Sequence, residues 1–362
     1  MSVAATEFDR TMSRPRQLEI DPLLIFAVAS LLLLGVVMVA SASMSVAERE
    51  YGSAFFYLQR HAAHLVVGLL LGLVVLGIPS EWWRAGSPVA LMFAFALLLV
   101  VLLPGVGHEV NGSVRWIRLG PLNLQVSEPA RLLIMIYLCG YLLRHGDAVR
   151  ASLIGFAKPL VVVALACALL LAQPDFGAAT VLLATCLGIM FLAGVRFSHF
   201  LLLFVVAALA LAALALSSDY RIARLKGFLD PWADRFAGGF QLTQSLIAIG
   251  SGDVGGTGLG ASVQKLFYLP EAHTDFVFAV LAEEFGLVGV VTIVVLYAVL
   301  VWRAMLIGAA AQAGSRYFQA LLAGGIGIWF GIQSSVNIGV NMGLLPTKGS
   351  VSYTHLRAHE TS

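Results

Sequence analysis

The sequence predicts an all-α polytopic membrane protein, and three observations support this fold class. The chain of 362 residues is 59% hydrophobic and only 12% charged, whereas a soluble domain normally carries about 25% charged residues. Its mean hydropathy is strongly positive, at +0.91. Long apolar runs follow one another along most of the chain, and a helix needs about 20 apolar residues to cross the hydrocarbon core of a bilayer.

Nine apolar runs meet or approach this length, so about nine transmembrane helices are expected. They cover residues 22–42, 61–78, 88–106, 129–143, 158–172, 177–194, 197–216, 275–302 and 318–340. The first run is long enough to stay in the membrane, so no cleavable signal peptide is expected. Residues 1–21 are polar and basic, and we expect them to form a cytoplasmic tail.

The distribution of lysine and arginine predicts the orientation of these helices. With the N-terminus in the cytoplasm, the segments predicted to lie inside carry Arg10, Arg14, Arg16, Arg84, Arg144, Arg150, Lys158, Arg196, Arg303 and Arg316. Two segments predicted to lie outside also carry cations. They are residues 107–131 and the large outer loop 217–274, between the seventh and eighth helices.

The cations on the outer side have two interpretations. They can bind an anionic ligand, or they can pair with the acidic residues of the same loop, Asp219, Asp230, Asp234 and Asp253. The cations in question are Arg115, Arg118, Arg131, Arg221, Arg224, Lys226, Arg235 and Lys265.

The outer loop contains two further features. Residues 241–249 alternate polar and apolar side chains at helical spacing, which predicts a short interfacial or re-entrant helix. The following segment, GSGDVGGTGLG at residues 250–260, predicts a flexible turn region. Glycine clusters can bind phosphate through backbone N–H groups, but this one lacks the Lys-Ser/Thr of a P-loop, so the indication is weak.

Asp275 is the strongest candidate for a catalytic group. It follows the polar run Tyr268–His273 and stands at the start of a long apolar run, where an ionisable group is costly to desolvate. Asp275 could simply cap that helix. However, Glu271 and His273 crowd the same short stretch, which suits a general base.

Other polar residues lie within or beside the apolar runs. At least one of Glu283 and Glu284 is expected to face a cavity or a cation, because two carboxylates facing lipid would be very costly. Glu128 and Arg131 stand three residues apart on one helical face and can pair, as a structural or a functional ion pair. Asp175, in the turn Gln-Pro-Asp-Phe-Gly, is interpreted mainly as the cap of the sixth helix.

Together these motifs resemble the SEDS family of cell-wall proteins, with its FtsW, RodA and SpoVE branches. The resemblance is carried by residues 111–116, Ser127-Glu128, residues 173–177, residues 248–286 and residues 337–349. The run Lys265–His273 and the basic N-terminal extension are more similar to the division branch of the family, FtsW, than to RodA.

The resemblance implies an inverting peptidoglycan glycosyltransferase that acts in septal cell-wall synthesis. The enzyme would polymerise lipid II, a disaccharide-pentapeptide linked to undecaprenyl diphosphate, at the outer face of the cytoplasmic membrane. The family's essential aspartate falls on Asp275, as the base for the acceptor 4-hydroxyl, and its intramembrane acid and base fall on Glu128 and Arg131. Candidate substrate-binding residues are Arg221, Arg224, Lys226, Arg115, Arg118, Lys265, His273 and Glu271.

The resemblance also implies a cofactor and partners. A divalent cation, Mg²⁺ or Mn²⁺, is expected to assist the transfer. The expected partners are a class B penicillin-binding transpeptidase and other membrane proteins of the divisome. Two alternatives remain open on the residues alone: a transporter that flips lipid II, and a non-catalytic scaffold that recruits a transpeptidase.

The chain departs from the family pattern at two places. Val126 stands where the family usually has Pro, and Arg131 stands where it usually has Lys. A tenth helix is expected after Gly349, but residues 350–362 resemble translated adapter sequence. We therefore expect a transmembrane domain over residues 22–349 and a non-native tail after it.

Overall fold

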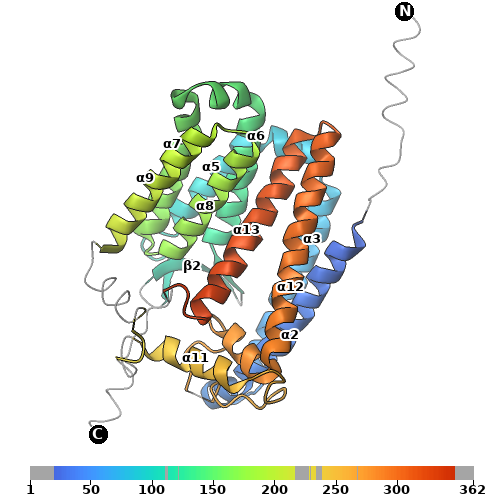
Figure 1. Cartoon of the computed structure of the whole chain (residues 1–362), viewed down its shortest axis with the longest axis vertical. Helices are drawn as coiled ribbons and strands as arrows, with labels where there is room; N and C mark the ends of the chain where they lie inside the picture. Colours follow the sequence, from blue (N-terminus) through green and yellow to red (C-terminus); the bar gives the residue numbers. More distant parts are fainter. Residues whose placement is uncertain are drawn as a thin grey trace, which may run out of the picture.

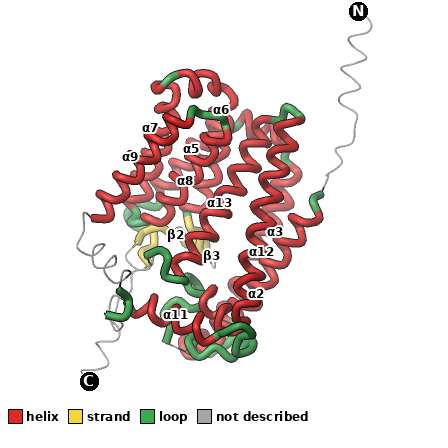
Figure 2. Tube along the Cα trace, viewed as in Figure 1, coloured by secondary structure: helices red, strands yellow, loops and turns green. Residues whose placement is uncertain are grey.

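The computed structural model shows a bundle of apolar helices with a small β-sheet at one end (Figures 1 and 2). It describes residues 20–110, 113–120, 122–216, 228, 230–233, 239–266 and 268–346. In this part of the chain, a helix lies over each of the nine predicted apolar runs. These helices are α2 (Pro22–Tyr51), α3 (Phe56–Gly77), α5 (Ser87–Val100), α6 (Ser127–Ala151), α7 (Leu153–Ala172), α8 (Phe176–Leu192), α9 (Phe197–Leu216), α12 (Val277–Ala313) and α13 (Tyr317–Asn341).

Six of these helices are long and apolar enough to cross a membrane, namely α2, α3, α6, α7, α12 and α13, whereas α5 and α8 are shorter apolar helices. Several helices run past the predicted boundaries. For example, α2 continues to Tyr51 and α12 to Ala313. A helix satisfies its own backbone hydrogen bonds, so its polar ends can project beyond the hydrocarbon layer.

Two short helices were not among the nine runs. α4 (Ser80–Ala85) joins α3 to α5, and α11 (Phe240–Ser251) lies in the outer loop. The helix predicted over residues 241–249 is therefore confirmed as α11. Its buried residues include Gln241, Thr243 and Ser245, so polar as well as apolar side chains of α11 face the protein.

A three-stranded antiparallel sheet forms in the segment predicted to be an outer loop. β1 (Gly107–Val110) pairs with β2 (Ser113–Leu119), which in turn pairs with β3 (Leu122–Gln125). Trp116 lies opposite Gln125 in the second pair, and a bulge at His108/Glu109 shifts the register of the first pair. The sequence did not predict this sheet. The all-α class nevertheless holds for the apolar bundle.

The helices pack into two connected regions. The larger core gathers buried residues of α5, α6, α7 and α8, together with Phe318 of α13. A second core joins Met38 and Ala42 of α2 to Ala248 of α11 and to the start of α12. α12 packs against both α13 and α2, so it joins the two regions.

An ion pair ties the start of α2 to α12 at the end of the bundle predicted to be cytoplasmic. Asp21 caps α2 by accepting a hydrogen bond from the Leu24 amide at 3.0 Å. Arg303 of α12 donates its Nε–H to the same carboxylate at 2.9 Å. The hydrogen bond from Arg303 is the main reason that the pKa of Asp21 lies below its ordinary value.

The sheet, α11 and the start of α12 all lie at the opposite end of the bundle, in the lower half of Figure 1. α12 rises from this end, and α13 returns to it. The positive-inside pattern predicts that this end faces outward.

Candidate functional site

Asp275 lies in the turn immediately before α12, and it is exposed. The N-cap position of α12 is Phe276, which makes no side-chain cap hydrogen bond. The N-cap position thus falls one residue after Asp275, the residue that the sequence offered as the cap. Asp275 is thus an exposed residue directly before Phe276, which is only 2% exposed and belongs to a buried core.

Asn341, the last residue of α13, holds the backbone on both sides of Phe276. Its Nδ2 donates to the Asp275 carbonyl at 3.0 Å, and its Oδ1 accepts from the Ala279 amide at 3.2 Å. The Ser245 hydroxyl of α11 donates to the carbonyl of Asn341 at 2.8 Å. The end of α13 thus joins α11, the Asp275 turn and the first turn of α12.

The glycine-rich segment fits into a break in α12. The break lies at Gly286, whose φ of 62° and ψ of −156° are non-helical. The Thr257 and Gly258 amides donate to the carbonyls of Glu283 and Glu284, at 2.9 and 3.0 Å. In return, the Leu287 and Val288 amides donate to the carbonyls of Asp253 and Val254, at 2.9 and 3.4 Å.

This exchange replaces helical hydrogen bonds that the break removes, since a regular helix would pair Glu283 with Leu287 and Glu284 with Val288. Close approach requires glycine on both sides: a Cβ at Gly256 would lie 2.2 Å from the Glu284 carbonyl oxygen, and one at Gly286 would lie 2.4 Å from the Gly256 nitrogen. The amides of Thr257 and Gly258 are used inside the protein. These two amides are therefore not offered to a phosphate.

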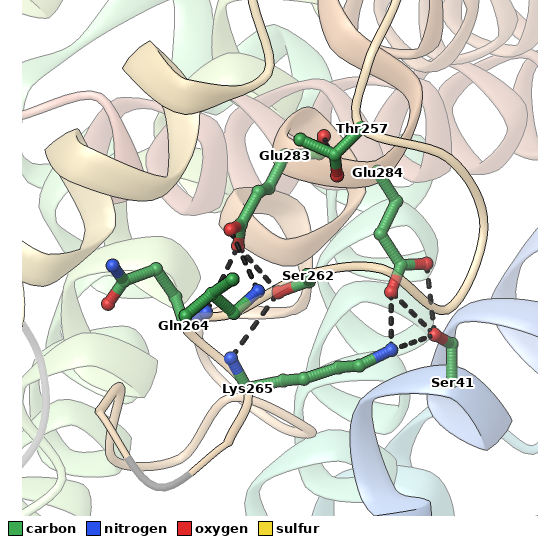
Figure 3. A network of polar contacts seen from close by, with 8 residues as sticks. Ser41, Thr257, Ser262, Gln264, Lys265, Glu283 and Glu284 are labelled. Carbon is green, nitrogen blue, oxygen red and sulfur yellow. Dashed lines mark hydrogen bonds and ion pairs between the residues drawn. The ribbon is translucent and has the colours of Figure 1, made fainter.

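Glu283 and Glu284 lie at the centre of a buried polar network (Figure 3). The Glu283 carboxylate accepts from the Ser262 hydroxyl at 2.5 Å and from the Val263 amide at 2.9 Å. Glu284 accepts from Lys265 Nζ at 2.6 Å and from the Ser41 hydroxyl of α2 at 2.7 Å. The expectation that at least one of the two carboxylates faces a cation is confirmed.

The prediction for Lys265 is corrected by the structure. The sequence placed this residue among the substrate-binding cations. Its side chain is only 7% exposed, and that of Glu284 is fully buried. Lys265 also donates to the Ser41 hydroxyl at 2.8 Å. A buried ammonium needs such partners, so Lys265 fastens the outer loop to α12 and α2 and does not face a ligand.

His273 and Glu271 lie in the same turn as Asp275, as predicted from the sequence. The His273 ring packs on Tyr57 of α3, with 4.6 Å between ring centroids. Burial lowers the pKa of His273 below its ordinary value, although Glu271 and Glu50 oppose the shift. Glu271 has a φ of 56° and accepts from the Thr274 hydroxyl at 2.6 Å, so it shapes the turn.

The sheet carries Arg115 and Arg118 at the same end of the bundle. Arg115 Nη1 lies 3.8 Å from the Asp175 carboxylate, an ion pair that the sequence did not predict. Asp175 also accepts from the Ala178 amide at 3.0 Å, which confirms that it caps α8. Arg118 is exposed and lies 2.5 Å from the His108 ring. Arg221, Arg224 and Lys226 lie outside the described residues.

Glu128 and Arg131 form the predicted ion pair, with 3.3 Å between Nη2 and Oε1. The Arg131 side chain is 3% exposed, whereas that of Glu128 is 38% exposed. Arg131 also donates to Gln333 Oε1 at 2.6 Å, and its guanidinium lies over the Trp329 ring at 5.2 Å.

Glu128 also lines a cavity between α6, α12 and α13. The cavity has a volume of about 240 Å³ and is lined by Glu128, Tyr297, Trp329, Phe330, Gln333, Ser334 and Asn337. Its lining combines three aromatic rings with two side-chain amides, one serine hydroxyl and one carboxylate, so the recess is partly polar. Asn337 joins this recess to the Asp275 turn, because its carbonyl accepts from Asn341 Nδ2 at 2.9 Å.

A metal site preformed by the protein does not fit the described residues, since no three His, Cys, Asp or Glu side chains converge there. Magnesium is often held by one or two carboxylates together with substrate phosphates, and such binding needs no preformed cluster. The divalent cation therefore stays a prediction.

Several polar residues that organise the site were not predicted from the sequence. Ser41 is the clearest case, because it lies within the first apolar run, where a serine carries little information. Asn341 lies in a segment that carries the family resemblance, but nothing in the sequence pairs it with Asp275. Gln333 and Trp329 likewise could not be predicted from the sequence, because they contact Arg131 only when α13 packs against it.

Comparison with known proteins gives a consistent result. The family model for FtsW, RodA and SpoVE, described as "Cell cycle protein", matches residues 22–352. The probable peptidoglycan glycosyltransferase FtsW of Thioalkalivibrio sulfidiphilus is 52% identical, over 96% of this chain and 88% of the relative. The protein of the same name from Legionella pneumophila is 50% identical, over 94% of this chain and 86% of the relative.

Solved structures share the fold. A chain from the structure described as "Structural coordination of polymerization and crosslinking by a peptidoglycan synthase complex" superposes with a TM-score of 0.73 at 30% identity, covering 92% of this chain and 90% of that one. The rod shape determining protein RodA of Thermus thermophilus superposes with a TM-score of 0.65 at 28% identity, covering 93% and 90%.

Proposed function

This chain belongs to the FtsW, RodA and SpoVE family, and we propose that it is a peptidoglycan glycosyltransferase that polymerises lipid II in septal cell-wall synthesis. It is a multi-pass membrane protein, and the proposed location is the bacterial cytoplasmic membrane at the division septum. The proposal places the reaction at the end of the bundle that holds the sheet, α11 and the Asp275 turn.

The observation that carries the proposal is the setting of Asp275. Asp275 is exposed, whereas its backbone carbonyl accepts a hydrogen bond from Asn341. A buried ion pair between Lys265 and Glu284 also fastens the outer loop before Asp275 to α12 after it. A general base must reach the proton it takes and must be held in place while it does so. An exposed group on an anchored turn meets both needs.

In the proposed reaction, Asp275 accepts the proton from the 4-hydroxyl of the acceptor sugar. The hydroxyl oxygen attacks the anomeric carbon of the donor sugar from the face opposite the lipid diphosphate. The new C–O bond forms as the bond to the diphosphate oxygen breaks, which inverts the anomeric configuration. The diphosphate leaves with the electron pair of that bond.

The leaving diphosphate develops negative charge that cations can stabilise. Arg118 is an exposed cation at this end of the bundle, and Arg115 is half-buried beside Asp175. We propose Arg118 as a diphosphate contact and assign Arg115 mainly to the ion pair with Asp175. Arg221, Arg224 and Lys226 of the outer loop remain proposed contacts. The divalent cation implied by the family would add charge at the same group.

The proposed partner is a crosslinking enzyme, specifically a class B penicillin-binding transpeptidase. One similar structure comes from a complex whose description joins polymerisation and crosslinking, and this supports the proposal. Other membrane proteins of the divisome are proposed as further partners.

The experiment is lipid II polymerisation by the purified protein with its transpeptidase partner, comparing wild type with Asp275→Ala and Asp275→Asn. Both variants should make no glycan strands above background, while retaining a wild-type unfolding midpoint. Glycan synthesis by the alanine variant at the wild-type rate would refute the role of Asp275. No synthesis by the wild type, with the partner bound, would favour a scaffold or a lipid II transporter.

A further inference from the structure

We propose that Asn341 is a positioning residue for Asp275, a buried carboxamide that fixes the turn from which the carboxylate projects. The proposal rests on the proposed function only for the chemical role of Asp275. The contacts themselves belong to the fold, and one arm of the test below does not depend on activity.

Asn341 supplies a helix cap from a distant part of the chain. The first N–H groups of a helix have no partner within it, and Phe276 at the N-cap of α12 provides no side-chain acceptor. Asn341 Oδ1 accepts from the Ala279 amide at 3.2 Å, an amide that also donates to the Phe276 carbonyl at 3.0 Å. The cap of α12 is thus placed on α13, 62 residues away in the sequence.

The same side chain also binds the residue before the helix. Asn341 Nδ2 donates one hydrogen to the Asp275 carbonyl at 3.0 Å and the other to the Asn337 carbonyl at 2.9 Å. A side-chain amide has two donor hydrogens and one acceptor oxygen, so all of its hydrogen-bonding groups are used. Rotating the amide by half a turn would set its oxygen against two carbonyl oxygens, so only one orientation fits.

The position of Asn341 is itself fixed. The residue is 1% exposed, and the Ser245 hydroxyl of α11 donates to its backbone carbonyl at 2.8 Å. The carboxamide therefore has little freedom to move, and it transmits its position to Asp275 and Ala279 on either side of Phe276. These contacts set the backbone angles between Asp275 and α12, which decide where the carboxylate points.

A general base that lies in a turn, as Asp275 does, needs its position to be fixed in this way. Catalytic groups need to be held within about 0.5 Å of their working position, and a misplacement of about 1 Å can reduce the rate by about 100-fold. No regular secondary structure holds Asp275 itself. Asn341 supplies a rigid anchor for this turn from α13.

The test uses the purified full chain and three variants. Asn341→Ala removes all three contacts. Asn341→Asp keeps an acceptor for the Ala279 amide but sets a carboxylate against the carbonyls of Asp275 and Asn337. Thr185→Val is the matched control, because Thr185 is fully buried in α8 and its hydroxyl donates one hydrogen bond, to the Val181 carbonyl at 2.7 Å.

Two readouts are measured. In lipid II polymerisation, both Asn341 variants should lower kcat by about 10- to 100-fold and leave KM within about twofold, while Thr185→Val keeps the wild-type values. In amide hydrogen exchange, residues 275–279 should exchange about tenfold faster in Asn341→Ala, as expected for the loss of about one hydrogen bond. Thr185→Val should leave that segment unchanged.

Each possible result decides the question. Wild-type kcat in Asn341→Asp, or unchanged exchange of residues 275–279 in Asn341→Ala, would overturn the proposal. A rise in KM with kcat unchanged would also overturn it, because it would assign Asn341 to substrate binding. If the wild type does not polymerise lipid II, the proposed function fails, and hydrogen exchange alone still decides whether Asn341 holds the turn.

Discussion

Lys265 and Glu284 lie on opposite sides of Asp275 in the sequence, and their buried side chains meet with 2.6 Å between Nζ and Oε1. The pair joins the two ends of the chain segment 265–284, which contains the Asp275 turn. Ser41 of α2 bonds to both members, at 2.8 Å from Lys265 Nζ and 2.7 Å from Glu284 Oε1. Helix α2 therefore also holds the Lys265–Glu284 pair in place, so the segment that contains the Asp275 turn is anchored at both ends.

Lys265→Met should destabilise the protein by about 3–5 kcal/mol, because it leaves the Glu284 carboxylate buried without a cation. The double variant Lys265→Met/Glu284→Leu should recover most of this loss, since it removes both charges. The midpoint of denaturant-induced unfolding in detergent measures both effects. A double variant as unstable as the single one would show that the pair matters through packing and not through its charges.

His273 should make stability depend on pH in a defined window. Burial lowers the pKa of His273 in the folded protein below 6.5, the ordinary value that applies to the unfolded chain. At a pH between the folded and the unfolded pKa, the folded protein therefore binds fewer protons than the unfolded chain. Stability is then fully present above pH 6.5 and is lost as the pH falls through the folded pKa. His273→Gln should reduce the loss of stability between about pH 7.5 and about pH 5.5, measured by thermal unfolding. An equal loss in both proteins would contradict the prediction.

Gly286→Ala should destabilise the break in α12 by about 1–3 kcal/mol, the usual cost of a strained backbone at a non-glycine residue. Its φ is 62°, and a Cβ there would lie 2.4 Å from the Gly256 nitrogen. Gly35→Ala is the matched control, because Gly35 lies within α2 and a Cβ there would meet nothing within 4 Å. That control should stabilise α2 by about 0.5–1 kcal/mol. Equal unfolding midpoints for the two variants would argue against strain at Gly286.

Arg131→Met should reduce lipid II polymerisation strongly, because it removes the cation beside Glu128 and the donor to Gln333. Arg131→Lys keeps the charge but loses the planar guanidinium over Trp329, a contact worth about 0.5–1 kcal/mol. Its rate should therefore fall by only about two- to fivefold. Steady-state rates at saturating lipid II provide the comparison. If both variants have the same rate, the charge at this position is not what matters.

The helices could be predicted because the length and apolar composition of each run alone indicate a helix that crosses the hydrocarbon layer. Every predicted run coincides with a helix of the described chain, and the run at residues 241–249 became α11. The ends of α2 and α12 were less predictable, since polar residues outside the hydrocarbon can still be helical. The sheet escaped prediction because its strands are short, and what stabilises them is pairing between strands.

The charged residues of the site could be predicted from the sequence, as could the short-range pair of Glu128 and Arg131, but the contacts between distant segments could not. Asp275, Glu283, Glu284, Glu128 and Arg131 stood out because charge is costly in an apolar chain. Lys265 stood out as a cation of the predicted outer loop, but only the fold shows that it pairs with Glu284 inside the protein. Asn341 is uncharged, and its role depends on a contact between α13 and a turn far away in the sequence.

The break in α12 also constrains how the protein is made and how its sequence can vary. Because Asp253, Val254, Thr257 and Gly258 each bond to a particular residue of α12, inserting or deleting one residue between them would shift the register. This stretch should therefore not tolerate changes of length, and Gly256 within it should not tolerate a side chain. During synthesis it leaves the ribosome before α12 does, so the groups that complete the broken helix are already present when α12 emerges.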